Sequence, residues 1–190
     1  MHIISKTPEG LYQACIQQVR DLVKNTKTLD KKHAFHESAN FVILEPDSHK
    51  NPVSYDGEKF SHSEQSKIFD TETDHYNNLI LSADIEGVLS CLKADPDSKK
   101  AYLSFWKNEF VSGKSGEIPC LVGVHFFIKE DKVFAVIQMR SNELSTLLPI
   151  DIYFGIAIQI YVSNKLKMTS GSYTHQVASL ILYSKDVEKL

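Results

Sequence analysis

The chain has 190 residues, of which 42% are hydrophobic and 24% are charged. These values are near those of ordinary globular proteins, so they exclude a disordered, fibrous or large multidomain protein. The 21 basic and 24 acidic side chains give a net charge of −3, without the overall positive field that non-specific nucleic-acid binding needs. We therefore expect no nucleic-acid partner, and any bound anion must be held at a local site.

Two apolar stretches, residues 150–162 and 178–183, are the longest in the chain. They are too short to span a bilayer, and Asp151 and Gln159 interrupt the first, so we expect no membrane-spanning segment. The first ten residues lack the basic start and apolar region of a secretory signal. We therefore expect a cytoplasmic protein whose cysteines are reduced.

The cysteines and histidines show no metal-binding pattern. The three cysteines lie far apart without a CxxC pair, which excludes a disulfide framework and a zinc site. The histidines of the polar segment lack ligand spacing backed by a third ligand, so we expect them in solvated loops. The residues concerned are Cys15, Cys91, Cys120, His49, His62 and His75.

The first half of the chain predicts one helix and one strand. Thr7 and Pro8 are typical of a helix start, and apolar residues at helical spacing follow as far as Val23. After a polar break, residues 41–44 predict a strand that ends at a Pro-Asp-Ser turn. The polar segment that follows, residues 49–78, has no clear periodicity.

The second half of the chain mixes helices and strands. Apolar spacing predicts a short amphipathic helix over residues 85–92 and a more apolar helix over residues 151–165. The β-rich runs predict strands over residues 101–106, 121–128, 133–139 and 177–183. Elements in this order predict an α+β fold in which helices pack on a sheet, with residues 1–190 as one domain.

Cys120 and Arg140 are the first pair of residues that could take part in catalysis. Cys120 precedes one predicted strand and Arg140 follows the next, so a hairpin would bring both to one edge of the sheet. A nearby guanidinium favours the thiolate, which is the nucleophilic form of cysteine, and Arg140 with Ser141 could bind a phosphate. Taken alone, a cysteine before an apolar strand is more often a packing residue.

Five short segments follow one another in the chain: Asp-Pro-Asp-Ser-Lys-Lys at 95–100, Pro-Cys at 119–120, Met-Arg-Ser-Asn-Glu at 139–143, Leu-Pro-Ile-Asp at 148–151 and Ser-Leu-Ile-Leu-Tyr at 179–183. In this order they resemble the thymidylate synthase family, most closely its deoxycytidylate hydroxymethylase branch. The spacings also fit the family: twenty residues from Cys120 to Arg140, eleven to Asp151 and thirty-two more to Tyr183. The resemblance covers residues 79–183, a little over half of the chain.

This resemblance implies a fold and an assembly. The expected fold is a twisted mixed β-sheet with helices on one face. Two copies are expected to pack sheet to sheet as a homodimer, in which Lys99 and Lys100 reach the partner's phosphate site. These lysines stand where the family has paired arginines, so they keep the charge but lose the bidentate fork.

The resemblance also implies a reaction on a pyrimidine nucleoside monophosphate. A cysteine thiolate adds to C6 of the ring, and C5 then attacks a one-carbon unit carried by 5,10-methylenetetrahydrofolate. The roles carried over are Cys120 as nucleophile, Glu143 and Glu64 as catalytic carboxylates, Arg140 and Ser141 as phosphate ligands, and Tyr183 as a donor to the sugar.

Asp151 indicates which base is bound. The thymidylate branch has Asn at this position, whose amide can both donate and accept, whereas an ionised Asp only accepts. Asp151 therefore suits the N4 amino group of cytosine and would leave O4 of uracil without a donor. The alternative role is that of an acid near a helix N-terminus, favoured by the helix dipole.

The departures from the family pattern leave the activity open. The family's histidine two residues before the tyrosine is Ile181 here, the segment between Glu64 and Tyr76 is short, and seven residues follow Tyr183. We therefore expect a domain reduced in its folate-binding segments. The hypotheses are a transferase that methylates or hydroxymethylates a cytosine nucleotide, a noncatalytic nucleotide-binding relative acting as sensor, regulator or subunit of a mixed dimer, and a folate-free exchange at C5.

Overall fold

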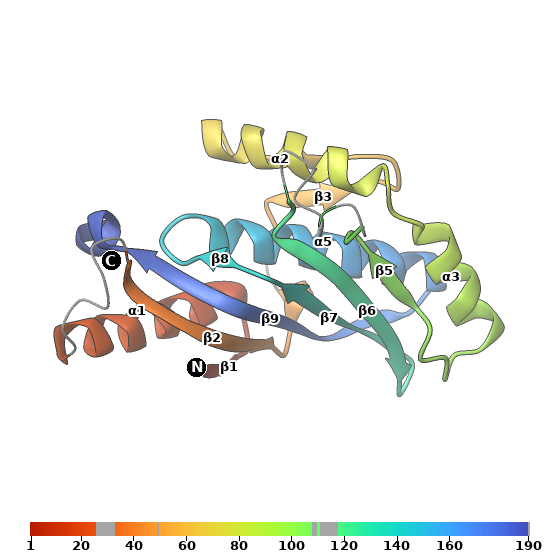
Figure 1. Ribbon diagram of the computed structural model, residues 1–190. Coiled ribbons are helices and arrows are strands. Elements are labelled where there is room, and N and C mark those ends of the chain that lie inside the picture. The colour runs from red at the N-terminus through yellow and green to blue at the C-terminus, as the bar shows by residue number, and fades with distance from the viewer. Residues whose placement is uncertain (26–32, 49, 108–109, 111–117, 190) are drawn as a thin grey trace.

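The computed structural model describes residues 1–25, 33–48, 50–107, 110 and 118–189 (Figure 1). A seven-stranded mixed sheet forms its centre. The strands are β1 (His2–Ser5), β2 (His33–Ile43), β5 (Tyr102–Ser104), β6 (Leu121–Lys129), β7 (Lys132–Met139), β8 (Asn142–Glu143) and β9 (Thr169–Tyr183). Their order across the sheet is β1-β2-β9-β7-β6-β5, and β8 pairs with the end of β9.

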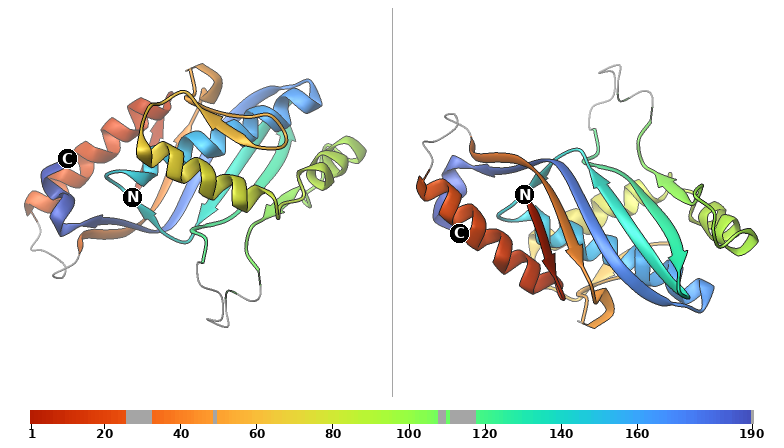
Figure 2. Two further views of the ribbon diagram at one scale, coloured as in Figure 1. Left: turned by 90° about the horizontal axis from the view of Figure 1, so that it is seen from above. Right: turned by 90° about the horizontal axis from the view of Figure 1, so that it is seen from below.

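In the part of the chain that the structure describes, the helices leave one face of the sheet uncovered. Seen from below, the strands face the viewer, and the main helices lie behind them (Figure 2). The helices are α1 (Pro8–Asn25), α2 (Lys67–Ile80), α3 (Ile85–Ala94) and α5 (Leu147–Leu166). A small hairpin of β3 (Val53–Tyr55) and β4 (Phe60–His62) lies between α2 and α5. The expected layered α+β architecture is confirmed.

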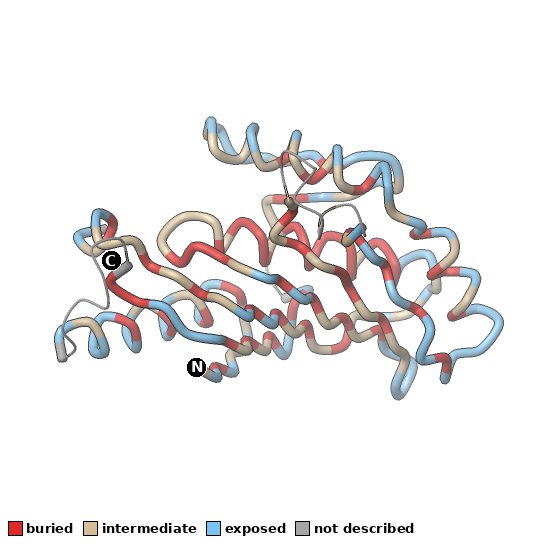
Figure 3. Tube along the Cα trace, in the orientation of Figure 1, coloured by how far each residue is buried: buried red, intermediate tan, exposed pale blue. Residues whose placement is uncertain are grey.

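The core forms between α5 and the sheet. The burial pattern alternates along β7 and β9, as expected for strands with one covered and one open face (Figure 3). Thirteen of the twenty residues of α5 are buried, among them Phe154, Ile156 and Ile158. The Nε2 amide group of Gln159 donates to the carbonyls of Val133 and Gly171, which ties α5 to β7 and β9.

Length and composition alone would let α5 cross a membrane, contrary to our expectation that no segment would qualify. The helix has 20 residues with a mean hydropathy of 1.3, but 72% of the apolar window is buried inside the fold. The sequence pattern underestimated it because the helix begins at Leu147, several residues before the predicted start. In this structure α5 is the core helix.

Several local predictions are confirmed. Thr7 caps α1 through a hydrogen bond from the backbone N–H of Gly10 to its hydroxyl, at 3.1 Å. Residues 129–132 form the hairpin turn between β6 and β7, where Glu130 and Asp131 have φ values of 52° and 55°. The hairpin places the end of β7 beside the start of β6.

Other elements were missed or were longer than predicted. β1 was missed, and β2 and β9 extend well before the predicted strands. The polar segment also contains α2, in which only Thr73, Tyr76 and Ile80 are buried. Nor is His62 a solvated loop residue, because its side chain is 13% exposed and lies 3.2 Å from Asp70; His49 lies outside the described residues.

Candidate active site

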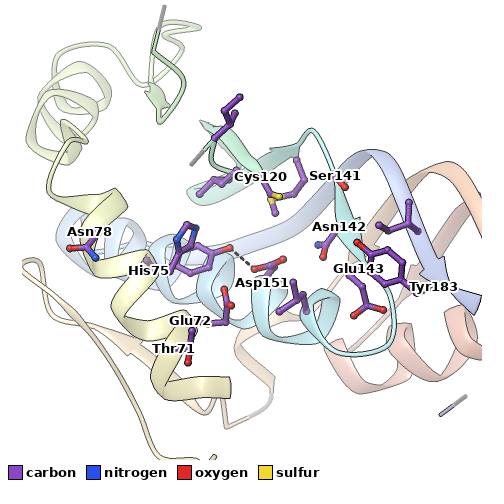
Figure 4. A pocket seen from close by; sticks show the side chains of 16 residues that line it. Thr71, Glu72, His75, Asn78, Cys120, Ser141, Asn142, Glu143, Asp151 and Tyr183 are labelled. Atoms are coloured by element: carbon purple, nitrogen blue, oxygen red, sulfur yellow. Dashed lines mark hydrogen bonds between the residues drawn. The ribbon is translucent and has the colours of Figure 1, made fainter. Parts of the chain in front are cut away.

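A cavity of about 550 Å³ lies where α2, β8, the first turns of α5 and the ends of β7 and β9 meet (Figure 4). Its size is that of a small-molecule site. Five residues singled out in the sequence line it: Cys120, Ser141, Glu143, Asp151 and Tyr183. They come from segments that are up to sixty-three residues apart, so the fold gathers them into one site.

Cys120 and Arg140 are neighbours, as the hairpin predicted. The backbone N–H of Arg140 donates to the carbonyl of Cys120 at 2.9 Å. The guanidinium donates to the carbonyls of Ile118 at 2.7 Å and Pro119 at 3.0 Å. Arg140 is exposed, and its guanidinium secures the backbone that leads into Cys120.

Arg140 favours the thiolate of Cys120, as expected, but burial and two carboxyl groups act in the opposite direction. Burial raises the pKa of Cys120, Arg140 lowers it, and the charges of Asp151 and Glu72 raise it further. The raising causes prevail, so the pKa lies above the ordinary value for cysteine. The nucleophilic form therefore requires a change at the site, such as a ligand that compensates the two carboxylates.

Asp151 lies at the bottom of the cavity and is 6% exposed. Its Oδ1 accepts a hydrogen bond of 2.8 Å from the hydroxyl of Tyr76 (Figure 4). Burial raises the pKa of Asp151 to about 7; hydrogen bonds from Tyr76 and Asn142 lower it, and the charge of Glu72 raises it. Near neutral pH this carboxyl group therefore exists in both protonation states.

The position of Asp151 in α5 argues against the alternative role at a helix N-terminus. The helix begins at Leu147, so Asp151 lies beyond the first turn, where the dipole acts most strongly. Its carboxylate accepts from Tyr76, a side chain on another helix, instead of capping its own. The buried carboxyl group is thus available to the cavity and not to the helix end.

Glu143 has a structural role that the sequence did not indicate. Its Oε1 accepts from the backbone N–H and the hydroxyl of Ser145, at 2.8 and 2.6 Å, and its Oε2 accepts from the backbone N–H of Thr146 at 2.9 Å. Thr146 is the N-cap of α5. Glu143 therefore holds the chain at the start of this helix, although it also lines the cavity.

Sequence reasoning missed the contribution of α2. Glu72, His75 and Tyr76 all line the cavity from this helix, and Figure 4 shows Glu72 and His75 on it. Burial raises the pKa of Glu72, and the charge of His75 lowers it. The spacing of Glu72 and Tyr76, four residues apart, was the available signal, because it puts both side chains on one face of a helix.

Three of the predicted site residues lie away from Cys120. Glu64 borders a separate hollow with Glu9, Lys50 and Tyr153 and does not line the cavity that holds Cys120. Lys100 borders another hollow beside α3, and Lys99 is exposed. Neither lysine lines the cavity of its own chain.

The cavity walls decide which groups it can hold. Among the residues that the structure describes, no group of three His, Cys, Asp or Glu side chains could bind a metal ion. A volume of about 550 Å³ suits one ligand of ordinary size. The described walls thus enclose room for one nucleotide, and none of the residues that line them is assigned to folate.

The buried carboxyl group of Asp151 should make stability depend on pH. The folded protein takes up a proton near pH 7, whereas the unfolded chain does so near 4, so burial costs most stability above pH 7. We expect Asp151→Asn to raise the free energy of unfolding by roughly 1–3 kcal/mol more at pH 8 than at pH 5. Urea denaturation of both proteins at both pH values measures this.

The exposed Asp97 supplies a matched control. For Asp97→Asn the difference from the wild type should be the same at pH 5 and pH 8. If Asp151→Asn behaves in the same way, Asp151 does not hold the proton assigned to it.

Comparison with known proteins agrees with this geometry. A family model described as thymidylate synthase matches residues 60–190. The bifunctional dihydrofolate reductase-thymidylate synthase of Paramecium tetraurelia is 25% identical over 125 residues, which are 66% of this chain and 26% of that protein. The thymidylate synthase of Bacillus licheniformis is 21% identical over 106 residues, which are 56% of this chain and 38% of that protein.

The fold has a counterpart among solved structures. A thermostable thymidylate synthase A from Bacillus subtilis aligns with a TM-score of 0.51 at 17% identity, covering 54% of this chain and 37% of that chain. The chain thus spans less than half the length of each of these three proteins. The fold is thymidylate-synthase-like, and because the family model matches well over half of the residues, the chain belongs to the thymidylate synthase family.

Proposed function

We propose that this protein transfers a one-carbon unit to C5 of a cytosine nucleotide, CMP or dCMP, as a methyl or hydroxymethyl group. The observation that carries the proposal is that Cys120 and Asp151 line one cavity. A nucleophile for C6 and a carboxyl group for the edge of the base thus share one site. Membership of the family supports pyrimidine C5 chemistry, and Asp151 supports cytosine as the base.

Asp151 recognises the base through one oxygen. Tyr76 occupies Oδ1, which leaves Oδ2 for the ligand. In the ionised state Oδ2 accepts from the N4 amino group of cytosine, and it repels O4 of uracil. In the protonated state an O–H can donate to O4, so the preference for cytosine should weaken as the pH falls below 7.

The chemistry at C5 needs a thiolate and a base. The Cys120 sulfur forms a bond to C6, and the electron pair of the C5–C6 double bond moves to C5. C5 then bonds the carbon of a one-carbon donor while the bond between that carbon and the donor breaks; water completes a hydroxymethyl product, whereas a methyl product requires a hydride from the donor. Loss of the C5 proton to a base and cleavage of the S–C6 bond restore the double bond. We propose Glu72 as this base, in place of Glu64, which was expected from the sequence. Glu72 lines the cavity, and burial raises its pKa.

The phosphate needs cations that the cavity of one chain does not supply. Among the described residues that line it there is no Lys or Arg, whereas Glu72, Glu143 and Asp151 are acidic. Arg140 lies beside the cavity, next to Cys120. We propose that it and Ser141 bind the phosphate together with Lys99 and Lys100 of a second copy, while Tyr183 binds the sugar.

A noncatalytic nucleotide-binding role is the second candidate. Two features favour it: burial raises the pKa of Cys120, and the cavity has the size of a single small ligand. Such a protein would bind the same cytosine nucleotide through the same residues. The two candidates differ only in whether a bond forms between Cys120 and C6.

Release of tritium from C5-labelled dCMP or CMP tests the thiol addition. We expect release by the wild type, because addition at C6 makes the C5 hydrogen exchangeable, and loss of release in Cys120→Ala. The measurement is made with and without 5,10-methylenetetrahydrofolate. Cys91 is also a partly buried cysteine, but it does not line the cavity. Cys91→Ala therefore serves as the control and should retain activity.

Nucleotide binding without tritium release under either condition would reject the transferase and leave the noncatalytic binder. Release that occurs only without folate would instead favour the exchange reaction at C5.

Calorimetry with cytosine and uracil nucleotides tests base recognition by Asp151. At pH 8 we expect the wild type to bind CMP or dCMP more than about tenfold more tightly than UMP or dUMP, and the ratio should shrink at pH 6. Asp151→Asn should lose the preference, because its amide can turn to donate to O4. Equal affinities in the wild type at pH 8 would refute the assignment.

We also propose that the uncovered face of the sheet packs against a second copy. On this face Phe127 and Phe134 stack with ring centroids 5.0 Å apart and planes 10° apart. The ring of Phe134 lies across Gly171, where a Cβ atom would come within 2.6 Å of it. The aromatic rings thus lie flat, which suits face-to-face packing of two sheets.

Light scattering at micromolar concentration tests this assembly. We expect a homodimer for the wild type and a folded monomer for Phe134→Lys, because a charge would be buried at the centre of the contact. Lys132→Glu, at the exposed hairpin turn, is the control and should remain dimeric. A monomeric wild type would contradict the proposal.

A further inference from the structure

The helix α2, which forms one wall of the cavity, buries little of its own surface. Only three of its fourteen residues, Thr73, Tyr76 and Ile80, are buried. Near its start, Oδ1 of Asp70 lies 3.2 Å from Nε2 of His62 on β4. Because apolar burial fixes this helix at so few points, individual polar contacts gain weight in setting its orientation.

Asn77 connects α2 to the backbone of the small hairpin. Its Oδ1 accepts from the backbone N–H of Phe60 at 2.5 Å, and its Nδ2 donates to the carbonyl of the same residue at 3.3 Å. Phe60 lies on β4, which among the described residues pairs only with β3, so the other edge of β4 has no neighbouring strand. The amide of Asn77 thus bonds to Phe60 as a residue of a further strand would.

The ring of Phe60 extends this contact into the core. It meets the ring of Tyr76 edge-on, with centroids 5.9 Å apart and planes at 76°, and that of Phe154 in the same way, at 5.1 Å and 74°. Tyr76 and Phe154 stack on each other, with centroids 4.1 Å and planes 3° apart. The three rings therefore form one cluster that joins β4, α2 and α5.

This cluster directs the hydroxyl of Tyr76 to Asp151. Asp151 and Phe154 both lie on α5 at the spacing i, i+3, so their side chains are neighbours on that helix. With its ring stacked on Phe154, Tyr76 donates from its hydroxyl to Oδ1 of Asp151 at 2.8 Å. A continuous series of direct contacts therefore leads from Asn77 to the carboxyl group.

The positions of Asn77 and Tyr76 on α2 are coupled by helix geometry. They follow one another in the chain, so their side chains leave the helix about 100° apart. An amide that is held on the backbone of Phe60 therefore fixes the rotation of α2, and with it the direction of Tyr76. Asn77 does not line the cavity, so it acts without touching a ligand.

We propose that Asn77 is a positioning residue for base recognition. Its hydrogen bonds to Phe60 hold α2 in the rotation that brings the Tyr76 hydroxyl to Asp151. Oδ1 of Asp151 is thereby occupied, and Oδ2 remains for the base. The role in recognising the base rests on the function proposed above, whereas the hold on the Tyr76 hydroxyl does not.

The proton NMR signal of the Tyr76 hydroxyl tests this hold directly. A buried hydroxyl that donates to a carboxyl group at 2.8 Å should give a slowly exchanging downfield signal, identified by its loss in Tyr76→Phe. In Asn77→Leu, which keeps the branched shape of the side chain without its polar atoms, we expect this signal to broaden or disappear. Asp74→Asn, at an exposed position of the same helix, is the control and should keep it.

Calorimetry at pH 8 measures the effect on base recognition. We expect the preference for CMP or dCMP over UMP or dUMP to fall severalfold in Asn77→Leu and to remain in Asp74→Asn. Asn77→Asp keeps the acceptor for the N–H of Phe60 and loses the donor to its carbonyl, so its preference should lie between those of the wild type and Asn77→Leu. If Asn77→Leu does not fold, a wild-type preference and hydroxyl signal in Asn77→Asp would reject the proposal.

A double-mutant cycle with Tyr76→Phe distinguishes positioning from a purely structural role. If Asn77 acts through the Tyr76 hydroxyl, its substitution has no further effect on recognition once the hydroxyl is absent. The double variant Asn77→Leu/Tyr76→Phe should therefore show the same base preference as Tyr76→Phe alone. Losses that add up would mean that Asn77 acts by another route, and they would overturn the proposal.

These measurements separate the proposal from the function on which it depends. If the wild type binds none of these nucleotides, the proposed function fails, and the hydroxyl signal alone decides whether Asn77 positions Tyr76. If the wild type prefers cytosine and a folded Asn77→Leu retains both the preference and the signal, the function stands and the positioning is wrong.

Discussion

Burial of the carboxyl group of Asp151 inside the core is the constraint on which the site depends. α5 is buried around most of its surface, so its buried polar side chains need hydrogen-bond partners within the protein. The hydroxyl of Tyr76 donates a hydrogen bond to Asp151, and Asn142 also lowers the pKa of this carboxyl group. Gln159 donates to the carbonyls of Val133 and Gly171. These hydrogen bonds compensate the burial of the polar groups of α5, and they also fix the position of the helix against α2 and the sheet.

The electrostatics of the cavity oppose its nucleophile. Burial raises the pKa of Cys120, and the lowering effect of Arg140 does not outweigh it together with the charges of Asp151 and Glu72. A ligand with hydrogen-bond donors would offset the negative charge, and only then would the thiolate become accessible. Such a site stays unreactive toward adventitious electrophiles while it is empty, because the thiolate is the reactive form.

The sequence predicted what depends on local pattern and known spacing. The capped start of α1, the β6–β7 hairpin and the proximity of Cys120 to Arg140 could all be predicted, because each is set by turn chemistry or strand pairing. The helix α2 could not, because only three of its fourteen residues are buried and tertiary packing decides its structure. The structural role of Glu143 could not be predicted either, because hydrogen bonds to backbone N–H groups and to the Ser145 hydroxyl produce no pattern in the sequence.

The two-residue strand β8 places two unrelated tasks on adjacent positions. Side chains alternate along a strand, so Asn142 turns toward His175 while Glu143 reaches the start of α5. Inserting a single residue before Asn142 would exchange the two directions, leaving the helix start without its carboxylate and putting a charge against a buried imidazole. Length variation among relatives should therefore be excluded from this segment and confined to the connections on either side.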